Sequence, residues 1–373
     1  SGGGDKSKFS TEDIHVEVDF DKEMLKEAPE TKTIISRADL DRKGARTLSD
    51  ALAAEQDIQM GTDNMGRKTV GIRGAEPRHT LILVDGRRLA GGLSKFYGAT
   101  DEVNRLGLDD VDHIEIIRGS GTARYGADAI GGVINIITKK AQGMKTTIGI
   151  GYGSYSRQQY SIANAGGENG WDWRIKYQKD KSGDFKDAHG DTTPSKLDAN
   201  SVGLHLGKQL SKASYLAFNL RSYKDSDRYQ ALYEKRQGLN VNRGNYDYLD
   251  GDLIWNVQID DTTKNQMSVS RSKYAYDLTS HYIDWWTLLP AQSFDEYDIQ
   301  TWRFSDQFDK KLGDHLLTAG FEFTKDDTTI KNGSIVSIDD RTLINRSFYL
   351  QDQWNILPTL KLTAGRTPDS NSA

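Results

Sequence analysis

The sequence predicts a mixed α+β domain followed by antiparallel transmembrane β-barrel strands. Three observations predict this fold. Up to about residue 142, short apolar strands mix with one helical segment. Beyond that point, long segments alternate apolar and polar residues with the period of two that gives a strand two different faces. The links between these segments alternate between short turns and long polar loops, which is the layout of an outer-membrane barrel.

The mixed domain is predicted over residues 20–142, after an N-terminal extension over residues 1–19. The segments TVGIRG, HTLILVDG and IEIIRG are expected to form strands because apolar and β-branched residues dominate them. TLSDALAAE is expected to form a helix, with Thr47 or Ser49 as its N-cap.

The barrel strands are predicted over residues 143–373. Trp171, Trp173, Ile175 and Tyr177 share one face of their segment, and Asp172, Arg174, Lys176 and Gln178 share the other. In the segment 252–260 only Ile254 breaks the same pattern. Long loops are expected near residues 183–198, 230–245, 281–295 and 327–340. A water-soluble sandwich also has alternating strands, but they are typically about 5 or 6 residues long, roughly half the length seen here.

Composition excludes several classes of protein. The chain carries 49 basic and 54 acidic side chains and a net charge of -5, so nucleic acid is not an expected partner. It has no cysteine, and its seven histidines lack the spacing of a metal site. No catalytic constellation emerges, so we expect neither an enzyme nor a resident cofactor or metal.

The glycine-rich stretch 114–140, IEIIRGSGTARYGADAIGGVINIITKK, is not a nucleotide site. A P-loop requires Lys and Ser or Thr where this chain has Ala127 and Asp128, and the carboxylate would repel a triphosphate. A dinucleotide fingerprint requires a glycine where Arg124 stands.

That stretch, with TLSDAL, VGIRG and LILVDGRRL before it, closely resembles the plug domain of TonB-dependent outer-membrane receptors of the ferric siderophore and colicin receptor type. One departure is Ser120, where the family usually has proline. The resemblance implies location in the bacterial outer membrane, with the N-terminus of the plug facing the periplasm and membrane lipid around the strands.

The resemblance also implies roles for the plug glycines and arginines. The glycines are expected to serve tight turns and packing inside the barrel, with the backbone close to the wall; they are Gly74, Gly86, Gly119, Gly126, Gly131 and Gly132. Arg73 and Arg118 each precede a glycine at a strand end, and they are expected to pair with glutamates of the inner barrel wall, because a buried guanidinium needs a carboxylate.

The segment DIHVEV in the N-terminal extension resembles a TonB box. Its alternating β-branched residues suit an extended segment that adds to the edge of a partner's sheet, and it comprises Asp13, Ile14, His15, Val16, Glu17 and Val18. The implied partner is TonB, which would pull on the plug to open a passage.

The implied ligand is a ferric siderophore, with the catecholate type leading, and haem and cobalamin remain alternatives. A structural or adhesive barrel is the alternative from another class. Two plug loops, 62–68 and 91–103, are expected to face outward and to bind the ferric chelate through Arg67, Lys95, Phe96 and Tyr97, because an anionic aromatic chelate requires positive charge and aromatic surface.

The number of strands falls short of a plugged barrel. About eleven strands are expected after residue 143, whereas a barrel wide enough for a plug has about 22. A half-barrel would leave two unpaired edges in lipid, so we expect a second polypeptide, as in a split receptor, or a missing C-terminal half to complete the wall.

Overall fold

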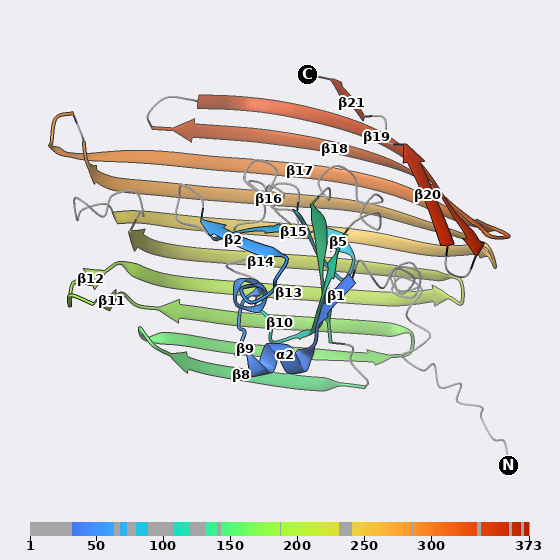
Figure 1. Ribbon diagram of the computed structural model, residues 1–373, viewed down its shortest axis with the longest axis horizontal. Coiled ribbons are helices and arrows are strands. Elements are labelled where there is room, and N and C mark those ends of the chain that lie inside the picture. The colour runs from blue at the N-terminus through green and yellow to red at the C-terminus, as the bar shows by residue number, and fades with distance from the viewer. Residues whose placement is uncertain are drawn as a thin grey trace, which may run out of the picture.

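The computed structural model describes residues 32–62, 68–72, 80–88, 107–118, 131–139, 143–186, 188–230, 241–284, 286–333, 337–357, 360–366 and 369–372. They form two parts, a small domain and a long, curved antiparallel sheet (Figure 1). We call the described residues between 32 and 139 the plug, and the curved sheet the wall. The plug sheet ends at Thr138 and the first wall strand begins at Lys145.

The plug contains two short helices and seven strands in its described residues. They are β1 (Lys32–Ile35), α2 (Arg37–Arg42), α3 (Leu48–Leu52), β2 (Ile58–Thr62), β3 (Lys68–Ile72), β4 (Thr80–Val84), β5 (Arg87–Arg88), β6 (Val111–Ile117) and β7 (Gly132–Thr138). Five strands form one sheet in the order β1-β6-β7-β4-β5, in which only β4 and β7 run parallel, and β2 pairs with β3.

Both helices begin at capping boxes. Thr47 caps α3 together with Asp50, so of the two predicted caps the first is correct. Helix α2 was not predicted from the sequence, although Ser36 and Asp39 supply the same reciprocal hydrogen bonds. Each helix buries an apolar side against the sheet, where Leu40, Leu48 and residues of β6 and β7 form one core.

Gly132 is required by packing within the plug. Its φ of +146° disfavours other residues, and a Cβ there would lie 2.9 Å from the carbonyl oxygen of Ile117 and 2.6 Å from Cδ1 of Ile72. The close neighbours of Gly132 thus belong to the plug, and its predicted approach to the wall stays a prediction. Gly86 forms the β4–β5 turn at φ +78°, and Gly131 lies in a bend before β7.

Substituting Gly132 with alanine is expected to destabilise the plug by about 2 kcal/mol, because the new methyl group meets a backbone atom in a strained conformation. Urea unfolding of the plug measures this change. Gly44 is a matched control, because it also has a positive φ but has open space around its Cβ position. If Gly132→Ala and Gly44→Ala lower stability equally, the close contact is not what requires glycine at residue 132.

The wall consists of long antiparallel strands, most of them joined in chain order. They are β8 (Lys145–Gly153), β9 (Arg157–Glu168), β10 (Trp171–Ser182), β13 (Ser195–Ser211), β14 (Ser214–Gln230), β15 (Val241–Asp260), β16 (Thr263–Ile283), β17 (Pro290–Leu312), β18 (His315–Asn332), β19 (Ser337–Leu357), β20 (Leu360–Arg366) and β21 (Asp369–Ser372). β20 and β21 pair with the same side of β19, so eleven strands stand side by side from β8 to β20. A separate hairpin, β11 (Phe185–Lys186) and β12 (Thr192–Thr193), extends one link.

Several of the predicted long loops are in part strands. β15 already begins at Val241, β17 at Pro290 and β19 at Ser337. On β15 the outward-facing residues change from apolar at Leu249 to polar at Asp247. Backbone pairing with β14 and β16 continues beyond that point. Backbone pairing thus extends past the apolar band, where the alternation that marks a membrane strand has ended.

The apolar face of the wall points outward and the polar face points toward the plug. Ile175 is 50% exposed, whereas Gln178 on the opposite face is 3% exposed. Ile254, the exception in its segment, is buried on the inner face at 4%. In a water-soluble barrel the apolar faces of the strands point inward. Here they point outward, as they do in a barrel whose strands lie in lipid. Among the described residues, no helix is long and apolar enough to cross a membrane.

Candidate functional site: the plug–wall interface

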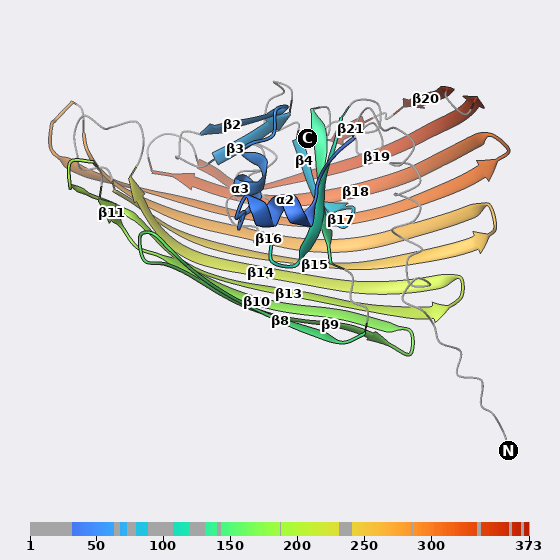
Figure 2. The ribbon, with the colours of Figure 1, turned by 60° about the horizontal axis from the view of Figure 1, so that its bottom comes forward.

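The plug lies on the concave, polar face of the wall (Figure 2). Two glycines lie where the parts approach closely. A Cβ at Gly107 of the plug would lie 2.6 Å from the Gln178 Oε1 atom, and a Cβ at Gly151 of the wall would lie 2.8 Å from Nη1 of Arg46. Glycine therefore brings the two parts together, but at positions that sequence reasoning did not single out.

Two ion pairs connect the plug to strand β10. Lys176 Nζ donates to Asp110 Oδ1 at 2.8 Å, and Arg174 Nη2 lies 3.6 Å from Asp85 Oδ2. Burial alone would raise the pKa of Asp110, but the nearby charges of Lys176 and Arg174 outweigh burial and lower this pKa. Asp110 is consequently an anion held against two wall cations.

Asp85 is fixed by its own strand turn. It lies at φ +49° before Gly86, a conformation in which an aspartate can bond nearby backbone. Its carboxylate accepts from the Thr138 backbone N–H at 2.9 Å and from the Thr138 hydroxyl at 2.6 Å. These bonds tie the end of β4 to the end of β7 and hold the carboxylate toward Arg174.

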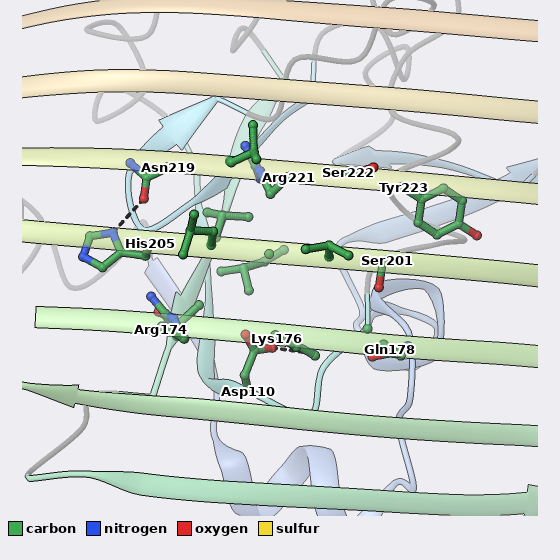
Figure 3. Close-up of a pocket in the computed structure, with 18 of the residues that line it drawn as sticks. Asp110, Arg174, Lys176, Gln178, Ser201, His205, Asn219, Arg221, Ser222 and Tyr223 are labelled. Carbon is green, nitrogen blue, oxygen red and sulfur yellow. Dashed lines mark hydrogen bonds and ion pairs between the residues drawn. The ribbon is translucent and has the colours of Figure 1, made fainter.

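The residues around these pairs line a cavity of about 190 Å³ between plug and wall (Figure 3). The wall side comes from β10, β13, β14 and β15, and the plug side from β4, β7 and the turn before β6. At one end His205 lies between Asp172 and Asn219, with ring nitrogen to oxygen distances of 2.6 Å and 2.7 Å. The cavity thus combines apolar lining, such as Val84 and Ile136, with charged side chains and with fixed hydrogen bonds at its edge.

Tyrosines dominate the inner wall beside this cavity. Five of them form one buried cluster with Leu278 and Ile299, and the partly buried Tyr223 packs against it; the five are Tyr246, Tyr248, Tyr274, Tyr276 and Tyr297. The ring centroids of Tyr246 and Tyr274 are 5.1 Å apart in an edge-on arrangement, which is a favourable geometry for aromatic rings. The sequence signal was present in GNYDYLD, where tyrosines take the positions of the polar face.

Comparison with known proteins gives three findings. Residues 24–133 match the TonB-dependent receptor plug domain. The vitamin B12 transporter BtuB of Vibrio cholerae is 30% identical over 316 residues, which cover 79% of this chain and 50% of that protein. The ferric enterobactin receptor PfeA of Pseudomonas aeruginosa superimposes with a TM-score of 0.71 at 19% identity, over 93% of this chain and 58% of that chain. The chain belongs to the TonB-dependent receptors.

The receptor is also similar in fold to the copper transporter OprC, with a TM-score of 0.72 at 15% identity over 91% of this chain and 55% of that chain. The siderophore receptor PirA of Acinetobacter baumannii superimposes with a TM-score of 0.70 at 16% identity, over 92% of this chain and 57% of that chain. The receptor chain spans about half the length of the relatives that it matches. The predicted mixed domain with barrel strands is confirmed by these comparisons.

The predicted partner of Arg118 is wrong. Arg118 pairs with Asp57 and donates to the Thr33 hydroxyl, both within the plug, rather than with a wall glutamate. Asp57 precedes β2, so two nitrogens of this guanidinium find partners within the plug, whereas its buried Nε has none among the described residues. The ion pairs that cross the interface have the opposite polarity, with cations on the wall and carboxylates on the plug.

Many predicted site residues lie outside the described residues of the receptor. This holds for the TonB box, Asp13 to Val18, and for the ligand residues Arg67, Lys95, Phe96 and Tyr97. It also holds for Arg73 and for Gly74, Gly119 and Gly126. Their roles remain predictions. Within the described residues, no cluster of three or more His, Asp or Glu side chains could hold a metal ion.

Proposed function

We propose that the protein imports a metal chelate across the bacterial outer membrane, with plug movement driven by TonB, and catalyses no reaction. One observation carries this proposal: a folded plug lies against the polar inner face of a strand wall whose outer face is apolar. A plug in that position blocks the lumen, so passage of a solute requires the plug to move. The N-terminus of the plug then faces the periplasm, where TonB would bind residues 13–18.

The ligand is proposed to be a ferric siderophore, in the first place of the catecholate type. Arg174, Lys176 and Arg221 line the plug–wall cavity, and such cations suit an anionic chelate. The plug loops predicted to bind it carry Lys95 and Tyr97, which combine charge with aromatic surface.

Cobalamin is a second candidate, because a vitamin B12 transporter shares 30% identity over 79% of this chain. Haem is the remaining alternative from the sequence. Growth of a strain with this protein is compared with growth of a strain without it. The three test media supply a ferric catecholate as iron source, haem as iron source, or cobalamin as the required nutrient. Loss of growth on one source alone identifies the ligand; unchanged growth on all three contradicts the proposal.

A double substitution, Lys95→Ala with Tyr97→Ala, is expected to weaken ferric catecholate binding by about 1 to 3 kcal/mol, because a charged and an aromatic contact are lost together. Equilibrium titration of the purified receptor measures this. Replacing Lys212 with alanine, in the short β13–β14 turn, provides the control. Equal affinities for both variants would move the ligand site away from the second plug loop.

The wall is proposed to continue beyond its edge strands. β8 and β20 each pair on one side only among the described residues, and unpaired backbone groups in lipid cost several kcal/mol each. The additional strands come either from the same polypeptide or from a second one, as in a split receptor. Mass analysis of the complex purified from membranes distinguishes the two sources.

A further inference from the structure

Gly203 opens a hollow in the inner wall between two cations. The register of the sheet pairs Gly203 with Lys176 of β10 on one side and with Arg221 of β14 on the other. A Cβ at Gly203 would meet no atom within 4 Å, whereas Cβ atoms at several other inward glycines of the wall would collide with side chains. The hollow is part of the plug–wall cavity seen in Figure 3.

Two guanidinium groups lining this cavity have unused donors. Arg174 Nη1 and Arg221 Nη1 are buried and have no hydrogen-bond partner in the described part of the chain, although the other end of each group is engaged by Asp85 and Asp250 respectively. A buried N–H group without an acceptor costs free energy, so an acceptor in the hollow would be stabilised. Anionic oxygens fit both the geometry and the charge.

The charge balance of the hollow depends on the plug. Among the described residues, the ion pairs of Arg174 and Lys176 are both with plug carboxylates, Asp85 and Asp110. Arg221 keeps its wall partner, Asp250. Movement of the plug would therefore leave two wall cations unpaired beside an open hollow, which is an anion site created by that movement.

We propose that the hollow over Gly203 is a transient binding site for the anionic oxygens of the transported chelate. Catecholate, carboxylate or phosphate oxygens would there replace the plug carboxylates of Asp85 and Asp110 on Arg174 and Lys176. The chelate thereby lowers the cost of separating the plug from β10, because each ion pair is exchanged rather than broken. This inference rests on the proposed function, since it places a step on the route past the plug.

Cysteine labelling tests the charge of the hollow without any transport. The chain has no cysteine, so Gly203→Cys provides a single thiol in open space. The thiol is treated with two methanethiosulfonate reagents, one carrying an anionic sulfonate group and the other a cationic trimethylammonium group. The ratio of the two reaction rates gives the charge preference of the hollow. Ser154→Cys, in the exposed β8–β9 turn, corrects for the intrinsic rates of the two reagents.

Two further variants change the charge of the hollow in opposite directions, and the first imitates the loss of a plug carboxylate on plug movement. Asp110→Asn removes a plug charge, and the preference for the anionic reagent is expected to rise about tenfold, as for one charge at short range in a partly shielded site. Arg174→Gln should lower that preference by a similar factor. No reaction at Gly203→Cys, or ratios that stay within about twofold in both variants, would overturn the anion site.

Uptake measurements test whether the hollow lies on the route. Gly203→Leu fills it, and is expected to slow uptake of a radiolabelled ferric catecholate at least about tenfold, because pore width and lining charge set passage. Gly251→Leu, on the outward face of β15, is the control. Uptake through Gly203→Leu at the parent rate excludes the route. If the parent itself takes up no chelate, the proposed function fails, while the labelling ratios still decide the anion site.

Discussion

Replacing Val16 with proline is expected to abolish energy-dependent uptake and to leave ligand binding intact. Proline has no backbone N–H to donate to a neighbouring strand, and its ring fixes φ near the polyproline value. An extended segment that binds TonB by strand addition would lose a hydrogen bond at its centre. Uptake of the labelled chelate by whole cells, compared with its binding to de-energised cells, separates the two effects.

A matched control for this substitution is Ser7→Pro, which places the same residue ahead of DIHVEV in the same N-terminal extension. We expect normal uptake from that variant. If Val16→Pro also takes up the chelate at the parent rate, TonB does not bind residues 13–18 as an added strand. If both variants fail, the extension acts through its flexibility rather than through a box.

The faces of the wall could be predicted from the sequence because the chemistry of a membrane strand is local. Lipid and lumen impose opposite demands on neighbouring residues, so the period of two in 171–178 identifies both faces without any knowledge of the partner strands. The extent of the hairpins could not be predicted in this way. Before Leu249 the outward face of β15 carries the polar residues Arg243, Asn245 and Asp247, and only the backbone ladder shows that the strand extends over them.

The partners at the plug–wall interface could not be predicted, because they depend on how two separately folded parts meet. Lys176 and Asp110 are 66 residues apart, and nothing local in either segment indicates the other. The family resemblance suggested plug arginines facing wall glutamates, whereas Arg118 forms its ion pair with Asp57 inside the plug. Gly107 was overlooked for the same reason, since its close neighbour is Gln178 of the wall.

Substituting Lys176 with methionine is expected to reduce the stability of the docked plug by about 3 kcal/mol, because Asp110 would then keep its charge in a largely buried position with its nearest cation gone. The side chains of this pair are 13% and 23% exposed, which places the cost at the lower end of the range for buried pairs. A fluorophore on Ala54→Cys, an exposed plug residue, reports plug unfolding in urea in the detergent-solubilised receptor.

The control for Lys176→Met is Lys224→Met, which removes the same type of residue from an ion pair with Asp247. That pair lies on the wall with side chains 65% and 48% exposed, so its loss should cost less than about 1 kcal/mol.

The double variant Lys176→Met with Asp110→Asn should recover part of the lost stability, because the uncompensated carboxylate is gone. Equal shifts for Lys176→Met and Lys224→Met would mean that the wall cation does not hold the plug. A large shift for Lys176→Met alone, relieved by Asp110→Asn, would mean that this pair must be separated or exchanged whenever the plug moves away from β10.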